Sequence, residues 1–374
     1  MFPGMVPSSR STTGTSAHRY PELDNPANPP YFDGYLNRMN VAILGCGSLG
    51  GVMAAGIAGR PDINLTVIDR DPSIAEAIMT NGLTLRRGKR TRTWGVRVVE
   101  KAGNESFDAL ILATKAGSLV EAARSLKQNL APEACVITVQ NGLVALDLVG
   151  VVGAERLVPG CVLWGASMEA PGEYRITNSG SFIIGSLDAA PPATAVSKAQ
   201  TLLSPIFPVT ISPNIRGVLW SKLAITTTFT TLGAITGLSF GQLAARAEIR
   251  KVMLRIGREL FAVGRAEGIT FEPLGAGLNF ERFLPDAGYS RFLKHLLIRI
   301  IGYKNRHDES SMLDSMRRGF KTEIDFINGT VVQSAERSGI PVPYNRLAVD
   351  LVEQMEQGSL RPALENLAAF RSLD

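Results

Sequence analysis

Six consecutive residues form a glycine-rich pattern that can bind phosphate groups: Gly45-Cys46-Gly47-Ser48-Leu49-Gly50. In a GxGxxG pattern the first glycine permits a tight turn, the second lets the backbone approach a pyrophosphate, and the third lets a helix pack closely on a strand. A helix that begins within the pattern offers unpaired N–H groups and the positive end of its dipole to the phosphates. The pattern therefore predicts a dinucleotide site, provided that a strand precedes it and a helix follows.

Two charged residues, about 20 positions after the loop, bear on the type of dinucleotide. Asp69 could accept hydrogen bonds from the 2′-hydroxyl of an adenosine ribose, which favours NAD. Arg70 could pair with a 2′-phosphate, which favours NADP, or it could be a solvated surface charge. These two residues alone leave both cofactors open.

Lys115 and Asn141 each follow a short apolar run, residues 109–113 and 135–139 respectively. If these runs are parallel strands, both side chains lie at the carboxyl edge of the sheet, where α/β proteins bind ligands. A lysine and an amide there can bind a phosphate, a nicotinamide amide or substrate oxygens. The alternative is that both are ordinary turn residues at strand ends.

The elements around these residues alternate between strand and helix. We predict strands at 41–44, 65–69, 109–113 and 135–139, helices at 48–59, 72–81 and 117–130, a hairpin of 83–87 with 94–99, and further strands within 157–188. This order predicts an α/β fold with a Rossmann-type doubly wound parallel sheet. The glycine-rich pattern thus has its strand before it and its helix after it.

Helical periodicity dominates after about residue 215. Long helices are predicted at 216–232, 240–268, 290–303, 311–338 and 346–357. The chain is therefore expected to have three parts: a disordered proline-rich tail (1–38), a dinucleotide-binding Rossmann domain (39–210) and an all-helical substrate or dimerisation domain (211–374).

Composition narrows the possible partners of this 374-residue chain. Its net charge is +5, with lysines and arginines scattered, which suits an anionic small molecule better than a nucleic acid. The three cysteines and three histidines lack metal-ligand spacing, so we expect no metal and a reducing, cytoplasmic setting. No run approaches the ~20 apolar residues that span a bilayer, so we expect no membrane partner.

Taken in order, the motifs resemble the ketopantoate reductase (2-dehydropantoate 2-reductase) family from about Asn40 to about Gly358. They are the glycine-rich loop, Thr114-Lys115-Ala116, Gln140-Asn141-Gly142, Trp220-Ser221-Lys222-Leu223, Ser310-Ser311-Met312-Leu313, Gly319 with Thr322-Glu323-Ile324-Asp325 to Gly329, and Pro343 with Asn345. The last long motif is the most specific of them.

The resemblance implies a function and roles. Family members reduce the ketone of ketopantoate with NADPH, so NADP is the expected cofactor, with NAD second. Lys222 would be the general acid, and Glu323 would hold the substrate hydroxyl, help set Lys222 and lie near the cofactor. Ser311 would contact the substrate carboxylate. Lys115 and Asn141 would lie at the nicotinamide and substrate edge, in a cleft between the two domains.

Two positions depart from the family pattern. The family usually carries asparagine four and eight residues after the catalytic lysine, and the first of these binds substrate; this chain has Thr226 and Thr230. The Thr226 hydroxyl could line the pocket or bond back to its own helix. The departure leaves the identity of the 2-oxo acid open.

The basic stretch 282–308 looks longer than in compact members of the family. It could cap the cleft, form a subunit contact in a homodimer, or be an amphipathic surface helix. Two alternatives to the reductase also remain: a related Rossmann-plus-helical dehydrogenase with another substrate, and a catalytically silent dinucleotide sensor. Retention of Lys222 and Glu323 argues against the sensor, which needs neither.

Overall fold

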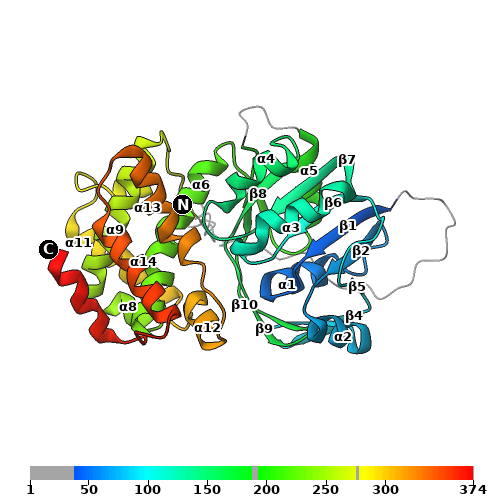
Figure 1. The fold of residues 1–374 in the computed structure, drawn as a ribbon, viewed down its shortest axis with the longest axis horizontal. Helices are drawn as coiled ribbons and strands as arrows, with labels where there is room; N and C mark the ends of the chain where they lie inside the picture. Colours follow the sequence, from blue (N-terminus) through cyan, green and yellow to red (C-terminus); the bar gives the residue numbers. More distant parts are fainter. Residues whose placement is uncertain (1–37, 188–192, 275–277, 374) are drawn as a thin grey trace, which may run out of the picture. The chain divides into compact units, whose positions relative to one another are not determined.

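The computed structural model describes residues 38–187, 193–274 and 278–373 (Figure 1). Apart from Arg38, the tail predicted to be disordered lies outside these residues. Within them, the sheet-containing part precedes the helical part along the chain, as the sequence predicts.

The first part is built on an eight-stranded sheet with strand order β12-β11-β8-β7-β6-β1-β2-β5. Its strands are β1 (Met39–Leu44), β2 (Ile63–Ile68), β5 (Arg97–Val99), β6 (Phe107–Leu112), β7 (Leu130–Thr138), β8 (Leu157–Val162), β11 (Phe182–Ile184) and β12 (Val209–Ile211). All neighbouring pairs are parallel except β8 with β11. The predicted parallel sheet is therefore confirmed, with one antiparallel pair near its edge.

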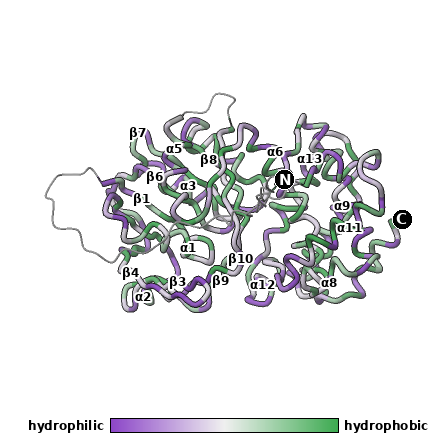
Figure 2. The backbone as a smooth tube through the Cα atoms, turned by 180° about the vertical axis from the view of Figure 1, so that it is seen from behind, coloured by the Kyte–Doolittle hydropathy of each residue, from purple (hydrophilic) through white to green (hydrophobic). Residues whose placement is uncertain are grey.

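Helices cover both faces of this sheet. They are α1 (Ser48–Ile57), α2 (Pro72–Asn81), α3 (Leu119–Leu126), α4 (Val149–Val152) and α5 (Ala193–Leu203). In β1, Val41 and Ile43 pack with α1 and α5, whereas Ala42 and Leu44 pack with α3 and α4. Because successive strand residues point to opposite faces, a strand buried on both sides must be apolar throughout. Figure 2 shows this as hydrophobic colouring along the central strands.

A second, four-stranded sheet has the order β4-β3-β10-β9. Its strands are β3 (Leu83–Arg87), β4 (Arg90–Trp94), β9 (Gly165–Ala170) and β10 (Glu173–Asn178). The hairpin predicted from 83–87 and 94–99 is wrong in its second strand, because a two-residue turn at Gly88-Lys89 pairs Arg87 with Arg90. Residues 97–99 instead join β2 as an edge strand of the large sheet.

From residue 215 onward the regular structure is helical. The helices are α6 (Ile215–Ile225), α7 (Thr231–Thr236), α8 (Phe240–Ala245), α9 (Ala247–Ala266), α10 (Phe280–Phe283), α11 (Arg291–Lys304), α12 (Ser311–Arg317), α13 (Asn328–Ser338) and α14 (Pro343–Glu356), with a 3₁₀ segment at Leu364–Leu373. Their apolar faces share one core. The domain boundary predicted at residue 210 stays a prediction; β12 ends at Ile211.

Three of the long predicted helices are interrupted. A π-helical turn, Thr226–Thr230, separates α6 from α7. Arg246 adopts an extended conformation between α8 and α9, which breaks the predicted helix 240–268. The predicted helix 311–338 was also wrong: Gly319 has φ +72°, a left-handed conformation that ends α12, and α13 begins only at Asn328.

The basic stretch 282–308 contains an amphipathic helix, α11. It packs closely on α8, since a Cβ atom on Gly302 would lie 2.1 Å from Ala244 Cβ. Its opposite face is exposed and includes Phe292 and Tyr303. A role in capping the cleft or in a subunit contact stays a prediction.

Candidate functional site

The glycine-rich loop has the geometry that a pyrophosphate site needs. Gly45 has φ +91°, and a Cβ atom there would lie 2.9 Å from Thr114 N. A Cβ atom on Gly50 would lie 1.9 Å from Gly45 O, so strand and helix pack too closely for any side chain. At Gly47 nothing lies within 4 Å, and the N-terminus of α1 has no side-chain cap. The loop therefore leaves open backbone where a phosphate would approach, which fits a dinucleotide.

The side chains within the loop serve to hold it. Cys46 is buried, and the Tyr174 hydroxyl donates to its carbonyl oxygen at 2.6 Å. Burial raises the pKa of the Cys46 thiol to about 12. The Ser48 hydroxyl accepts from Met168 N at 3.1 Å, which ties the start of α1 to β9. Tyr174 was not foreseen from the sequence; its ring packs on Gly51, where a Cβ atom would lie 2.2 Å from it.

A cavity of about 450 Å³ opens beside the loop, at the carboxyl ends of β1, β2 and β6. The charged residues that line it are Asp69, Arg70, Glu100, Lys101 and Glu121. The hydroxyl of Thr114, another lining residue, is buried without a hydrogen-bond partner. A hydroxyl without a protein partner is able to bond to a ligand that enters the cavity. The cavity therefore fits the adenosine half of a dinucleotide.

Asp69 is already engaged by the backbone. One carboxylate oxygen accepts from Cys46 N at 2.5 Å and the other accepts from Asp71 N at 2.9 Å. The carboxylate thus stabilises the glycine-rich loop itself. Arg70 is exposed at the cavity wall, as is Lys101 after β5, for which no sequence motif predicts a role.

Three adjacent strand ends place the remaining predicted side chains. Lys115 follows β6, and Asn141 follows β7, whose neighbour on the other side is β8. Lys222, from α6, donates its ammonium group to the carbonyl oxygen of Val162, the last residue of β8, at 2.7 Å. The sheet edge that carries Lys115 and Asn141 therefore also carries Lys222, a second lysine, which comes from the helical part.

Glu323 reaches the same edge from the segment between α12 and α13. Its carboxylate accepts from Ala116 N at 3.2 Å, next to Lys115. Burial raises the pKa of Glu323, while the Ala116 bond and the charge of Lys115 oppose that rise. Lys115 donates to the Ser315 hydroxyl at 3.3 Å, and its Nζ lies 4.5 Å from the centre of the Phe320 ring.

That Glu323 helps to set Lys222 stays a prediction, because the described part of the structure shows no direct contact between the two side chains. Within residues 38–187, 193–274 and 278–373, no hydrogen bond or ion pair joins the two side chains. Ala116 follows β6 and Val162 ends β8, and β7 lies between these two strands in the sheet. Asn141 follows the strand between them.

The structure places Ser311 and Thr226, the two hydroxyl residues predicted to bind substrate, in different surroundings. Ser311 is exposed in the first turn of α12, while its neighbour Ser310 is buried and caps that helix. The Thr226 hydroxyl lies 3.1 Å from Leu223 O and 3.3 Å from Lys222 O. It therefore bonds back to its own helix, and the prediction of a substrate-binding hydroxyl at Thr226 finds no support in this geometry.

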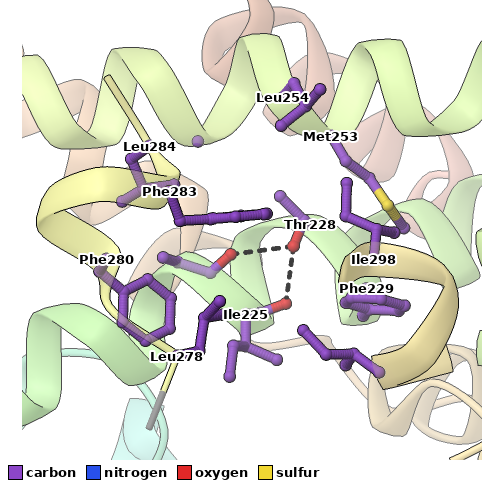
Figure 3. Close-up of a pocket in the computed structure, with 13 residues that line it drawn as sticks. Ile225, Thr228, Phe229, Met253, Leu254, Leu278, Phe280, Phe283, Leu284 and Ile298 are labelled. Carbon is purple, nitrogen blue, oxygen red and sulfur yellow. Dashed lines mark hydrogen bonds between the residues drawn. The ribbon is translucent and has the colours of Figure 1, made fainter. Parts of the chain in front are cut away.

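A second, much smaller cavity of about 30 Å³ lies in the core of the helical part (Figure 3). Its walls are mostly aliphatic and aromatic side chains from α6, α9, α10 and α11, including Phe280, Phe283 and Ile298. The one hydroxyl in view, that of Thr228, bonds back to Ala224 O at 2.9 Å and Ile225 O at 3.0 Å. The cavity offers no free polar group and is a packing void.

The described residues contain no cluster of three or more histidine, cysteine, aspartate or glutamate side chains placed to hold a metal ion. None of the helices in those residues combines the length and the apolar character that a membrane crossing requires.

Known proteins similar to this chain agree with one another. The family model described as ketopantoate reductase PanE/ApbA matches residues 41–189, and the model of its C-terminal part matches residues 214–356. The 2-dehydropantoate 2-reductase of Pyrococcus abyssi (strain GE5 / Orsay) is 25% identical over 318 residues, covering 85% of this chain and 98% of that protein.

Solved structures extend the comparison. A PanE/ApbA family ketopantoate reductase from Ralstonia eutropha JMP134 matches with a TM-score of 0.70 and 28% identity, over 86% of this chain and 99% of the other. D-mandelate dehydrogenase, in a ternary structure with NADH and anilino(oxo)acetate, matches with a TM-score of 0.74 and 21% identity over the same shares. At that identity the second likeness concerns the fold alone.

Proposed function

Because the chain belongs to the ketopantoate reductase family, we propose that it is a nicotinamide-dependent oxidoreductase that reduces a small anionic 2-oxo acid to the 2-hydroxy acid. Ketopantoate, giving pantoate, is the first candidate substrate, since relatives along most of the chain carry the name 2-dehydropantoate 2-reductase. One observation carries the proposal: Lys222 and Glu323 are both held at the carboxyl edge of the sheet whose glycine-rich loop fits a dinucleotide.

Lys222 is the proposed general acid. A bound reduced nicotinamide would supply the hydride, and negative charge would develop on the ketone oxygen. An ammonium group close to that oxygen lowers the barrier electrostatically and can then donate its proton. The bond from Lys222 to Val162 O orients the ammonium group and leaves two further N–H donors for the substrate.

Glu323, Asn141 and Ser311 are the proposed substrate contacts. The Glu323 carboxylate can accept from a substrate hydroxyl while it keeps the Ala116 bond, since each carboxylate oxygen accepts more than one hydrogen bond. No described residue hydrogen-bonds the Asn141 side chain, so its amide can serve a ligand. Ser311, exposed at the first turn of α12, is available for a carboxylate.

NADP is the proposed cofactor. Asp69, the residue that would favour NAD, already binds Cys46 N and Asp71 N. Arg70 and Lys101 line the adjacent cavity and supply two cations for a 2′-phosphate. The two cations make NADP the first candidate, and the Asp69 oxygens, which can each accept a further hydrogen bond, keep NAD as the second.

A bulkier 2-oxo acid is the second candidate substrate. The Thr226 hydroxyl is satisfied within its helix, so this position lacks the polar contact that an asparagine amide would make. A pocket that loses a hydrogen bond to its substrate discriminates less in favour of that substrate. With threonine at 226 the proposed reaction, reduction of a 2-oxo acid, stays the same. What differs is the substituent next to the ketone that the pocket accepts.

The test is turnover with purified protein, followed by the loss of reduced-nicotinamide absorbance with NADPH or NADH. Ketopantoate and a panel of bulkier 2-oxo acids are the substrates. Lys222→Ala should lower kcat by about 10²-fold to 10⁴-fold. Lys198→Ala is the matched control, because Lys198 also donates to a backbone carbonyl, Glu133 O, but lies outside the site. Cofactor binding without turnover on the whole panel would refute the proposal in favour of a dinucleotide sensor.

A further inference from the structure

A buried polar network joins two segments of the helical part. Asn328 and Asn345 are fully buried, as are Thr227 and Thr231. The Thr231 hydroxyl donates to Asn328 Oδ1 at 2.6 Å, and Asn328 Nδ2 donates to Asn345 Oδ1 at 3.0 Å and to Thr227 O at 3.3 Å. The network therefore joins the π-helical turn after α6 to the start of α13.

The π-helical turn explains why an amide is needed there. The Thr231 amide bonds to the carbonyl oxygen of Thr226, five residues back. In an α-helix it would bond to the carbonyl of Thr227, four residues back. The turn thus releases the Thr227 carbonyl, which the Asn328 amide satisfies. A buried carbonyl without a partner is costly, so the irregular helix and Asn328 depend on each other.

Each of the two segments that the network joins lies close in sequence to a proposed catalytic side chain. The π-helical turn continues the helix that carries Lys222, and Asn328 opens α13, five positions after Glu323. Lys222 and Glu323 do not bond to each other; each is held by main-chain atoms of the sheet. The Asn328 network is a direct bridge between their two supporting segments within the helical part.

The far end of the network is anchored in the core. Asn345 Nδ2 donates to Glu259 Oε2 at 2.8 Å, and the same carboxylate accepts from the backbone amides of Tyr344 and Asn345 at 2.9 Å each. Every hydrogen bond of Asn328 therefore ends on a group that is itself fixed. Fully satisfied buried networks of this kind impose one geometry on the segments that they join.

We infer that Asn328 is a positioning residue, which sets the spacing between Lys222 and Glu323 through the π-helical turn. This inference rests on the proposed reductase function. The Asn328 side chain is fully buried and bonds only to protein groups among the described residues. Its role is to keep the general acid and the substrate-holding carboxylate in register, because small errors in such spacing are expensive in rate.

Two variants test the inference from opposite sides of the bond. Asn328→Ala removes the amide, and Thr231→Val removes only the hydroxyl that donates to it while nearly keeping the shape. Asn366→Ala is the matched control: its amide donates to Ile235 O and Arg361 O, and it lies outside the network. Assays run well below the Tm of each variant, with kcat, substrate KM and cofactor Kd measured separately.

The expected result is a loss of kcat of about 10²-fold for Asn328→Ala and about tenfold for Thr231→Val. Cofactor Kd should be unchanged, and Asn366→Ala should lower Tm without lowering kcat. A wild-type kcat in both network variants would overturn the inference. So would a loss of kcat that follows Tm in the same way in all three proteins.

Hydrogen exchange separates this inference from the proposed function. Thr231→Val should speed amide exchange at residues 323–327, and Asn328→Ala should speed it at residues 226–231. If the wild type reduces no 2-oxo acid, the proposed function has failed, and this reciprocal exchange still decides whether the two segments are coupled. Exchange confined to the substituted segment would show that they are not.

Discussion

The backbone amide of Ala116 donates to the carboxylate of Glu323 at 3.2 Å, and the two residues are 207 positions apart in the sequence. A main-chain donor is present at 116 for every residue except proline, so the anchor of the carboxylate does not depend on the side chain there. Lys115 beside it is held by Ser315 and by the Phe320 ring, both from the segment that precedes Glu323.

Glu323→Gln should separate the charge of this group from its position. Glutamine keeps an oxygen for the Ala116 bond but loses the negative charge, so we expect kcat to fall by about 10²-fold. Burial raises the pKa of Glu323 above its ordinary value of 4.5, so the ionised form costs stability. The cost is present above the raised pKa and disappears as pH falls towards 4.5.

The measurement is Tm against pH for wild type and Glu323→Gln. The variant should be the more stable protein at neutral pH, and the difference should shrink as the solution is acidified. A variant that is less stable at neutral pH and equally stable in acid would contradict the pKa direction. Glu323→Ala, which loses the oxygen as well, shows how much the Ala116 bond itself contributes.

Substitution of glycines in the loop should separate folding from cofactor binding. Gly47→Ala places a methyl group in open space, so we expect an unchanged Tm and a large loss of dinucleotide affinity. Gly50→Ala places one 1.9 Å from Gly45 O, and overpacking of this kind costs about 1–3 kcal/mol or more. Gly95→Ala, also in open space but away from the loop, is the control. Unchanged cofactor binding in Gly47→Ala would remove the loop from the site.

Cofactor preference should depend on two cations. Arg70→Ser and Lys101→Ser should each raise KM for NADPH about tenfold, because a hydrogen bond to a charged group contributes roughly 1.5–3 kcal/mol. KM for NADH should stay the same. Lys127→Ser makes the same change of charge on an exposed residue that does not line the cavity. A preference for NADH in the wild type would reverse the assignment and return Asp69 to the ribose.

The thiol of Cys46 should be inert although it lies in the phosphate-binding loop. Burial raises its pKa to about 12, as it does for Cys135, and the Cys161 pKa is raised as well. Thiolates are the reactive form, so native protein at pH 8 should react with none of its three cysteines. All three should react in denaturant. The prediction would be contradicted if Cys46 reacted rapidly in the native protein and bound dinucleotide prevented the reaction. That result would show that the thiol faces the ligand.

Local signals account for the elements that the sequence predicted well. The helix Pro72–Asn81 begins after Asp71, whose side chain accepts from Ser73 N, and has proline in its first turn. Both features are readable from the sequence. By contrast, the break between α12 and α13 lies within a stretch whose apolar spacing continues, and only the backbone of Gly319 reveals it. Periodicity reports which face is buried and is insensitive to such a break.

Some residues of the candidate site could likewise be placed from the sequence, and others could not. Lys115 and Asn141 could be placed at the sheet edge because they follow strands, and topology puts strand ends together. The partners of Lys222 and Glu323 could not, since Val162 O and Ala116 N are main-chain groups that do not depend on the type of side chain, apart from proline at 116. Tyr174 and Asn328 were missed because each acts on a segment far away in the chain, and neither has a neighbouring residue that marks it.

The order of these contacts along the chain has a consequence for biosynthesis. Every described residue that shapes the glycine-rich loop lies before position 180, from Cys46 to Tyr174. A nascent chain emerges from its N-terminus, so the ribosome can release a segment able to form the loop while Glu323 is still unmade. The bond between Ala116 and Glu323 can form only after residue 323 has been made, because it joins residues 207 positions apart. During translation the cofactor site can thus precede the catalytic one.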